Sequence, residues 1–141
     1  MSTELINKYS VGEIQFPTKS GLLSMLVKKE LILEIIQKIK EDDKLLYDQL
    51  IDITVIDNVL SKQNYSTQRY TIIYSFLSLS FNKRMLVYSN ISEDDQNIDS
   101  ITQIFESANW FEREIYDLFG INFKNHPNLQ RIMNDYNFQG H

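Results

Sequence analysis

The alternation of apolar and polar residues near the start of the chain predicts two short strands. VGEIQF at 11–16 and LLSMLV at 22–27 are apolar enough for strands, and Pro17 and Gly21 mark a turn between them. We therefore expect a hairpin or two adjacent strands. One long helix from Leu22 is the competing interpretation, but the apolar positions of 22–27 do not share a single helical stripe.

The middle of the chain predicts one helix followed by three strands. From 30 to 43, apolar residues return at helical spacing opposite charged ones, which is typical of an amphipathic helix packed by one face. LIDITVID at 50–57 alternates with a period of two, with Ile51, Ile53 and Val55 on one side, as in a half-buried strand. A polar loop follows this strand. Residues 69–80 and 84–90 flank a short turn and predict an antiparallel hairpin.

The last third predicts two helices, IDSITQIF at 98–105 and ANWFEREIYDLFG at 108–120. Ser107 or Asn109 can cap the second helix, and Gly120 can end it in the left-handed conformation. The predicted order is strand, strand, helix, three strands, helix, helix. This order is typical of a two-layer α+β fold, with a mixed, mostly antiparallel sheet and helices on one face.

Length and composition narrow the function classes. With 141 residues, the chain is long enough for one domain, 1–141, and short for two. A net charge of −5 disfavours nucleic acid as a partner, because phosphate binding needs clustered Lys and Arg. The absence of cysteine excludes disulfides, thiolate metal sites and self-ligated iron–sulfur clusters. No apolar run has the length of about 20 residues that a membrane-spanning helix needs.

The second predicted helix carries two different faces. At about 100° per residue, four apolar side chains share one arc and predict a core contact: Phe111, Ile115, Leu118 and Phe119. Four others share another arc, and they are Trp110, Arg113, Glu114 and Asp117. Arg113 and Asp117 are spaced to pair at i,i+4. A tryptophan among such charges fits an interface hot spot, while a core tryptophan or a solvated charged face is the plainer alternative.

The same residues leave a catalytic interpretation open. Glu114 and Asp117 at i,i+3 could hold a divalent ion together with His126 if the loop folds back, as in a small metal-dependent hydrolase. Glu112 lies about 160° around the helix from Glu114, so the Glu-x-Glu pair does not converge. A capping or hydrogen-bonded loop histidine is the alternative role for His126.

The C-terminal residues carry a family resemblance. ANWFEREIYDLFG followed by INFKNHPNLQRIMNDYNFQGH closely resembles the signature of the thirty-kilodalton subunit of respiratory complex I, also called its ninth or C-type subunit, and upstream strand segments are similar too. The resemblance makes 107–141 the signature helix and docking segment and 1–10 an N-terminal extension. The residues that match the family motif are Trp110, Glu112, Arg113, Glu114, Asp117, Phe119, Gly120, His126, Pro127, Leu129, Arg131, Asp135, Tyr136, Gly140 and His141.

The resemblance implies a non-catalytic structural subunit of the peripheral arm, in the quinone module, of proton-translocating NADH:ubiquinone oxidoreductase. Such a protein binds no metal or cofactor itself, since FMN and the iron–sulfur clusters sit on other subunits. Its partners are the other complex I subunits, chiefly the 49 kDa-type quinone-site subunit. The implied location is the matrix side of the mitochondrial inner membrane, and an isoleucine- and asparagine-rich chain with Ala108 as its single alanine fits an AT-rich organellar genome.

Two departures from the family pattern qualify the resemblance. Where the family reads HPDLRRIL and DYGFEGHP, this chain has HPNLQRIM and DYNFQGH, which removes three charges and places Asn137 at a usual glycine. The family also continues past the Gly-His pair into a long tail, whereas this sequence stops at His141. We therefore expect a separate polypeptide or another subunit to supply the tail.

Overall fold

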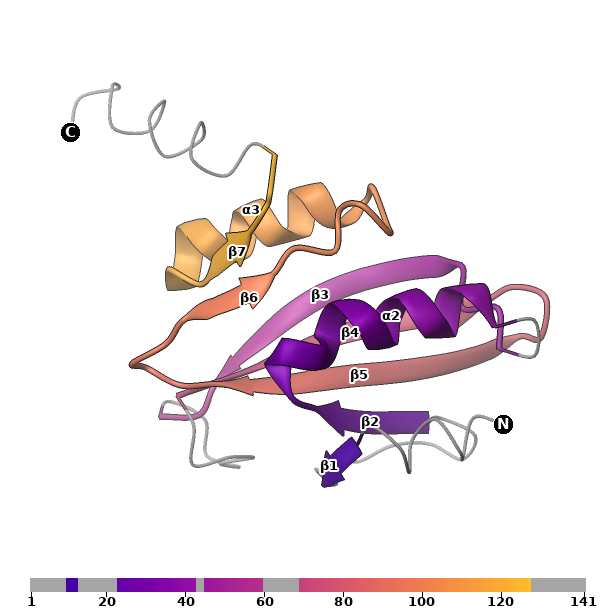
Figure 1. The fold of residues 1–141 in the computed structure, drawn as a ribbon, viewed down its shortest axis with the longest axis horizontal. Coiled ribbons are helices and arrows are strands. Elements are labelled where there is room, and N and C mark those ends of the chain that lie inside the picture. Colours follow the sequence, from indigo (N-terminus) through magenta and orange to yellow (C-terminus); the bar gives the residue numbers. More distant parts are fainter. Residues whose placement is uncertain (1–9, 13–22, 43–44, 60–68, 128–141) are drawn as a thin grey trace.

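A five-stranded mixed sheet forms the centre of the fold (Figure 1). The structure is a computed structural model and describes residues 10–12, 23–42, 45–59 and 69–127. β3, β4 and β5 form an antiparallel meander, β2 pairs in parallel with β5, and β1 pairs antiparallel with β2. In sheet order the strands are β1 (Ser10–Gly12), β2 (Leu23–Val27), β5 (Lys83–Ile91), β4 (Tyr70–Ser78) and β3 (Gln49–Asp57).

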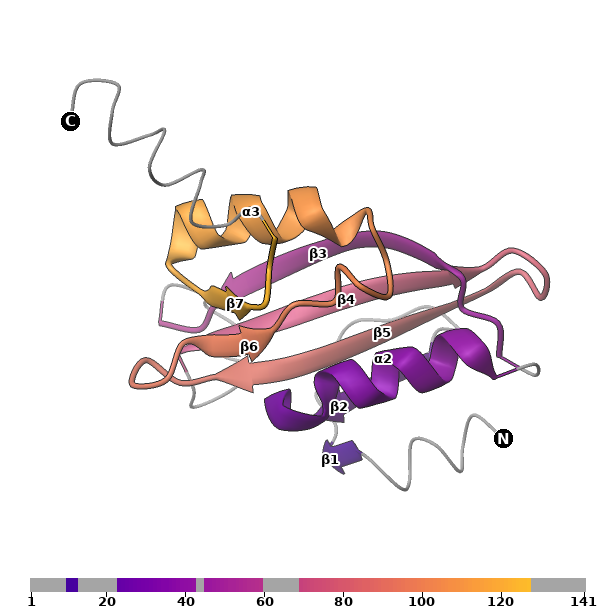
Figure 2. The same ribbon diagram turned by 45° about the horizontal axis from the view of Figure 1, so that its top comes forward.

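The helices cover one face of this sheet (Figures 1 and 2). A short 3-10 turn, η1 (Lys29–Leu31), leads into α2 (Ile32–Glu41), and α3 (Ala108–Phe119) follows late in the chain. Because strand side chains alternate between faces, Tyr74 points into the core beneath the helices while its neighbour Ile73 packs with Tyr88 on the other face. The predicted two-layer α+β fold with a mostly antiparallel sheet is confirmed.

α2 is held to the sheet by the amphipathic pattern that predicts it. Its buried side chains recur at helical spacing and join the same core as the inward-facing strand residues. They are Ile32, Ile35, Ile36 and Ile39. No helix in the described part of the chain combines the length and apolar character that crossing a bilayer requires.

The prediction of a helix at 98–105 is wrong. The structure has β6 (Asn97–Asp99) there, which pairs in parallel with β7 (Asn122–Lys124), and a turn follows β6. Ile98 and Phe123 are partners in this small sheet, and both are buried. The later apolar residues of the segment are buried by the turn, where the Phe105 N–H donates to the Ile101 carbonyl at 2.9 Å. The spacing of these apolar residues matches that of a helix, but the segment does not form one.

The strand predicted at 50–57 forms, but Ile51 does not face the core. The register shifts between Leu50 and Asp52, so Ile51 is the extra residue of a bulge and is 43% exposed. Leu50 and Ile53 occupy the buried positions instead. The predicted pairing near the start of the chain forms between β1 and β2, and residues 13–16 of that prediction lie outside the described residues.

Candidate functional site

The ends of α3 fix the position of the candidate site. Gly120 follows the helix with φ 74° and ψ 14°, and its N–H donates to the Tyr116 carbonyl at 2.9 Å. The predicted left-handed end is confirmed, and glycine suits it because it has no Cβ to strain this conformation. Ser107 occupies the N-cap position, but its side chain makes no capping hydrogen bond, so the predicted cap contact is wrong. Asn109 lies inside the helix.

The buried face of α3 is centred on a carboxylate. Ala108, Glu112 and Ile115 are the buried residues of the helix, and the Phe119 ring packs edge-on against Tyr70 at 5.7 Å between centroids. Leu118, which the sequence places in the core, is 73% exposed. It lies about 60° from Ile115 around the helix, on the side away from Glu112, so burying Glu112 turns Leu118 outward.

Glu112 holds the segment after β6 against α3. Its Oε1 accepts a hydrogen bond from the Ser100 hydroxyl at 2.6 Å, and its Oε2 accepts one from the Ile101 N–H at 2.9 Å. The Ser100 hydroxyl also lies 2.8 Å from the hydroxyl of Thr102. These partners lie 11 or 12 positions from Glu112 in the sequence, so no local spacing indicates them.

Burial dominates the electrostatics of this carboxylate. It raises the pKa of Glu112 to about 7 from an ordinary value of 4.5, although the bonds from Ser100 and Ile101 act in the opposite direction. The hydroxyl of Tyr74 is buried without a hydrogen-bond partner. Burial, the Glu112 carboxylate and the Asp99 carboxylate together hold the pKa of Tyr74 well above its usual value. Glu112 is therefore mostly protonated below neutral pH and loses its proton around pH 7.

His126 completes the inner side of the site. Its side chain is fully buried, and Nε2 lies 3.1 Å from the Asn109 carbonyl and 3.9 Å from Glu112 Oε1. Because a carbonyl only accepts hydrogen bonds, Nε2 carries the hydrogen in this contact. Burial comes first and the Arg113 charge second in lowering the pKa of His126, while the Asn109 bond opposes them. His126 thus ties the loop after β7 to the first turn of α3.

The outer face of α3 presents an aromatic side chain and charges. Trp110 is 59% exposed, which rules out the core tryptophan alternative. The Arg113 guanidinium lies over its ring at 5.5 Å from the centroid, and Arg113 Nε is buried without a hydrogen-bond partner. Glu114 and Asp117 are exposed. The predicted Arg113–Asp117 pair is wrong, since no ion pair joins them in the structure.

The three residues of the metal-site alternative do not lie together in the structure. Glu114 and Asp117 project outward from α3, whereas the His126 ring is buried on the inner side next to Glu112. Within the described residues, no group of three or more His, Cys, Asp or Glu side chains is placed to hold a metal ion. Pro127 is exposed. The remaining motif residues lie outside the described residues: Leu129, Arg131, Asp135, Tyr136, Gly140 and His141.

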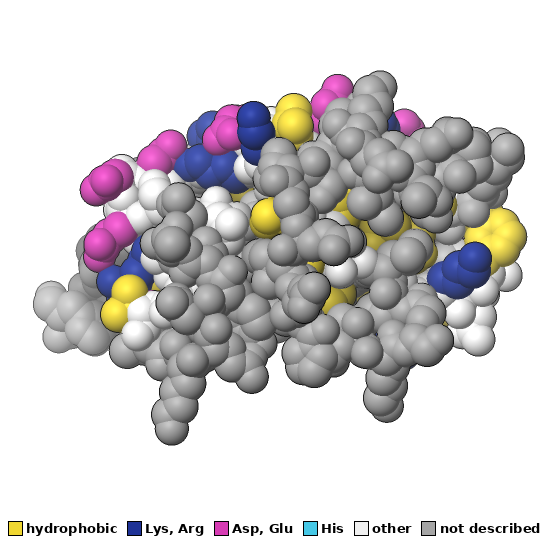
Figure 3. All heavy atoms as spheres, turned by 90° about the horizontal axis from the view of Figure 1, so that it is seen from below, with side chains coloured by type: hydrophobic (Ala, Val, Ile, Leu, Met, Phe, Trp, Pro, Cys, Tyr) yellow, Lys and Arg dark blue, Asp and Glu magenta, His cyan; other side chains and the backbone are white. Residues whose placement is uncertain are grey.

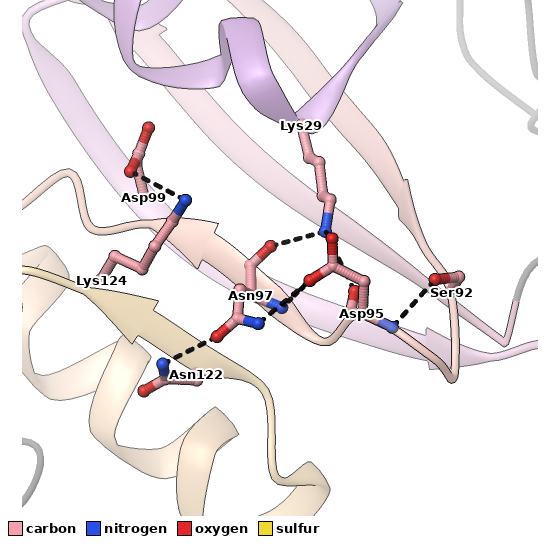
Figure 4. A network of polar contacts seen from close by, with 7 residues as sticks. All are labelled: Lys29, Ser92, Asp95, Asn97, Asp99, Asn122 and Lys124. Carbon is pink, nitrogen blue, oxygen red and sulfur yellow. Dashed lines mark hydrogen bonds and ion pairs between the residues drawn. The ribbon is translucent and has the colours of Figure 1, made fainter.

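A polar network fixes the small sheet beneath α3 to η1, the turn that precedes α2 (Figure 4). Lys29 Nζ donates to the Asn97 carbonyl at 2.9 Å and lies 2.8 Å from the Asp95 carboxylate, whose pKa falls to about 2 chiefly through its bond with Lys29. Asn122 Nδ2 donates to Asn97 Oδ1 at 2.8 Å, and Lys124 lies 3.8 Å from Asp99. The small sheet that supports α3 is therefore tied by side chains to η1, the turn between β2 and α2.

Comparison with known proteins decides the family. The sequence profile described as "Respiratory-chain NADH dehydrogenase, 30 Kd subunit" matches residues 25–141. The chain belongs to this 30 Kd subunit family. The match covers the main sheet from within β2, the helices α2 and α3, and the segment after β7.

Relatives and a solved structure agree with the 30 Kd subunit family. The chain is 40% identical over 121 residues to the C-type NADH-quinone oxidoreductase subunit of Citrifermentans bemidjiense, covering 86% of this chain and 71% of the relative. It is 36% identical to the combined C/D-type protein of the same oxidoreductase in Proteus mirabilis, covering 98% of this chain and 23% of that protein. A solved trypsin-resistant fragment (1–134) of Nqo5 matches with a TM-score of 0.75 and 28% identity, covering 89% of this chain and 94% of the fragment.

The family members differ in length. The chain spans between 23% and 59% of the length of four bacterial relatives, all named as the C-type or combined C/D-type subunit of NADH-quinone oxidoreductase. The fold, α3 and its supporting small sheet thus belong to the part that this chain shares with longer proteins.

Proposed function

We propose that the chain is a non-catalytic structural subunit of the peripheral arm, in the quinone module, of a proton-translocating NADH:quinone oxidoreductase. In this role it docks other subunits and supports electron transfer from NADH to the quinone without carrying out a redox step. The observation that carries the proposal is the outer face of α3, where exposed Trp110 lies beneath an Arg113 guanidinium with an unpartnered buried Nε.

The physical reason is that this face is costly to leave uncovered. An exposed tryptophan next to arginine is the pairing enriched at the energetic centres of protein interfaces. A buried guanidinium N–H without an acceptor costs free energy, and the planar guanidinium of Arg113 over Trp110 is a group that a partner's carboxylate can bind. Exposed Leu118 adds apolar area on the same helix. Glu112 and His126 anchor the opposite side of the helix, so the outer face is held rigid for docking.

The partner we propose for this face is the larger, 49 kDa-type subunit that lines the quinone site. The Proteus mirabilis relative supports close association with one other subunit type, because its name joins the C and D types in one protein and the matched region is 23% of its length. A protein that unites the two types in one chain keeps them close together. The remaining subunits of the arm are further partners.

We also propose that the chain carries no cofactor, and that FMN and the iron–sulfur clusters belong to other subunits. The absence of cysteine supports this for the clusters, whose usual ligands are thiolates. We place the chain on the matrix side of the mitochondrial inner membrane, or on the equivalent side of a bacterial membrane. The isoleucine- and asparagine-rich composition supports the mitochondrial assignment.

Separating assembly from turnover tests the proposal. Arg113→Ala and Glu114→Ala should each lower the amount of assembled oxidoreductase several-fold while NADH:quinone turnover per assembled complex stays near that of the parent. Glu34→Ala, which removes an exposed carboxylate from α2, is the matched control and should leave both quantities unchanged. Normal assembly with a large loss of turnover per complex would contradict a purely structural role.

A further inference from the structure

The β4–β5 hairpin ends in a well-defined turn. Ser78 and Lys83 form its last pair, and the Phe81 N–H donates to the Ser78 hydroxyl at 3.3 Å. Asn82 takes a positive φ of 52°, a conformation that asparagine tolerates better than most residues. The backbone of residues 79–84, the hairpin tip, therefore presents its side chains in a fixed arrangement.

Among the described residues, the hairpin tip extends past the strands that flank β4 and β5. On one side, β2 pairs with β5 only from Met85 onward, and on the other, β3 pairs with β4 only as far as Leu77. The two ribbon views show β4 and β5 extending beyond α2 at this end (Figures 1 and 2). The C-terminal end of α3 is at the other end of β4, where Phe119 contacts Tyr70. The hairpin tip is thus a separate surface from that end of α3.

The chemistry of the hairpin tip is apolar and basic. All six of its residues are exposed, including Leu79 at 64% and Phe81 at 46%. Lys83 and Arg84 are its two cations, and in the described part of the chain no ion pair involves either of them. Residues 58–92 contain no Asp or Glu, although the whole chain carries a net charge of −5. Figure 3 shows yellow beside dark blue at this end, with magenta gathered elsewhere on that face.

We propose that the hairpin tip is a second docking element, which receives an apolar protein segment that carries carboxylates on a neighbouring subunit. Phe81 and Leu79 fill an apolar recess of that segment, and Lys83 and Arg84 pair with its acidic side chains. Charge complementarity selects such a partner, because residues 58–92 contain no Asp or Glu and neither cation forms an ion pair within the described residues. Aromatic and arginine side chains together are the usual anchors of protein interfaces.

A protein partner fits the hairpin tip better than a membrane surface. Each cation near an anionic bilayer contributes about 1 kcal/mol, so two cations give only weak attraction. Two apolar side chains add little insertion into lipid, and the net negative charge of the chain opposes approach to an anionic surface. A protein recess with matching carboxylates uses all four side chains at once.

Site-specific photo-cross-linking in the intact assembly tests this inference. The full chain is expressed in its cells with the photoreactive amino acid p-benzoylphenylalanine in place of Phe81, membranes are irradiated, and adducts are mapped by mass spectrometry. We expect an adduct with a peptide of another subunit that contains Asp or Glu close to the attachment point. Adducts with lipid alone, or no adduct at all, would overturn the proposal.

Charge reversal gives the second measurement. In the cross-linking chain, Lys83→Glu with Arg84→Glu should lower the adduct yield at least several-fold, whereas Lys28→Glu, an exposed lysine on the segment between β2 and η1, should leave it unchanged. Replacing the mapped partner carboxylate by lysine should restore the yield with the reversed tip. An adduct yield that the charge reversal leaves unchanged would overturn the electrostatic part of the proposal. This readout does not depend on α3, so it remains separate from the assembly test of Arg113.

Discussion

Replacing Glu112 by glutamine should remove most of the pH dependence of stability that this carboxyl group causes. The folded protein raises the pKa of Glu112 to about 7 from 4.5, so the folded state holds a proton that the unfolded state releases between these values. The stabilisation that protonated Glu112 contributes is therefore fully present below pH 4.5, and it is lost as the pH rises through 7. The difference in pKa corresponds to about 3 kcal/mol in total, of which roughly 2 to 3 falls between pH 5 and 8.

Glutamine fits the same hydrogen bonds as the protonated acid. Its carbonyl oxygen can accept the Ile101 N–H, and its amide can donate to the Ser100 hydroxyl, which can turn its own hydrogen toward Thr102. Glu112→Gln should therefore match the parent near pH 5 and exceed it by roughly 2 to 3 kcal/mol at pH 8.

Urea unfolding of the purified full chain, followed by far-ultraviolet circular dichroism at pH 5, 6, 7 and 8, measures this difference. His126 has a lowered pKa and works in the opposite direction, since its stabilising effect grows as pH rises toward 6.5. It is present in both proteins and largely cancels in the comparison. Glu114→Gln, an exposed change on the same helix, should follow the parent at every pH. Parallel pH profiles for Glu112→Gln and the parent would refute the reasoning.

Three further predictions concern the supports of α3. Ile115→Ala removes a buried side chain of the helix and should lower the free energy of unfolding by roughly 2–5 kcal/mol in urea titrations, far more than Leu118→Ala, whose side chain is exposed. Gly120→Val should reduce the melting temperature more than Gly120→Asn, because φ is 74° while the Cβ position is open, and equal losses would argue against backbone strain. Lys29→Met should raise the pKa of Asp95 from about 2 toward 3.8 in a carboxyl NMR titration, and an unchanged value would exclude Lys29 as its main cause.

The sequence predicts the elements whose side chains repeat with a clear period. α2 and the β4–β5 hairpin follow from their apolar spacing, and Gly120 marks the end of α3 because few other residues adopt its conformation. The helix predicted at 98–105 does not form for a physical reason. A three-residue strand and a turn bury Ile98 and Ile101, and the spacing of these two residues is also that of one face of a helix. β7 depends on its pairing with β6, which no local pattern encodes.

Only part of the candidate site can be predicted from the sequence. The helical arc containing Trp110 and Arg113 follows from their spacing on α3, and so does the separation of Glu112 from Glu114. The burial of Glu112 does not, because it depends on the Ser100 hydroxyl and the Ile101 N–H brought in from the segment before the helix. Because Glu112 is buried, Leu118 is exposed, whereas apolar spacing alone wrongly predicts that Leu118 lies in the core.

The central claim, that this chain is a structural subunit of an NADH:quinone oxidoreductase, is tested most directly by native gel electrophoresis of detergent-solubilised membranes. An in-gel NADH oxidation stain locates the enzyme, and mass spectrometry of the stained band identifies its chains. We predict that this chain is present in a large NADH-oxidising band together with the subunit of the quinone site. Finding the chain only as a free small protein, with the stained band lacking it, would contradict the claim.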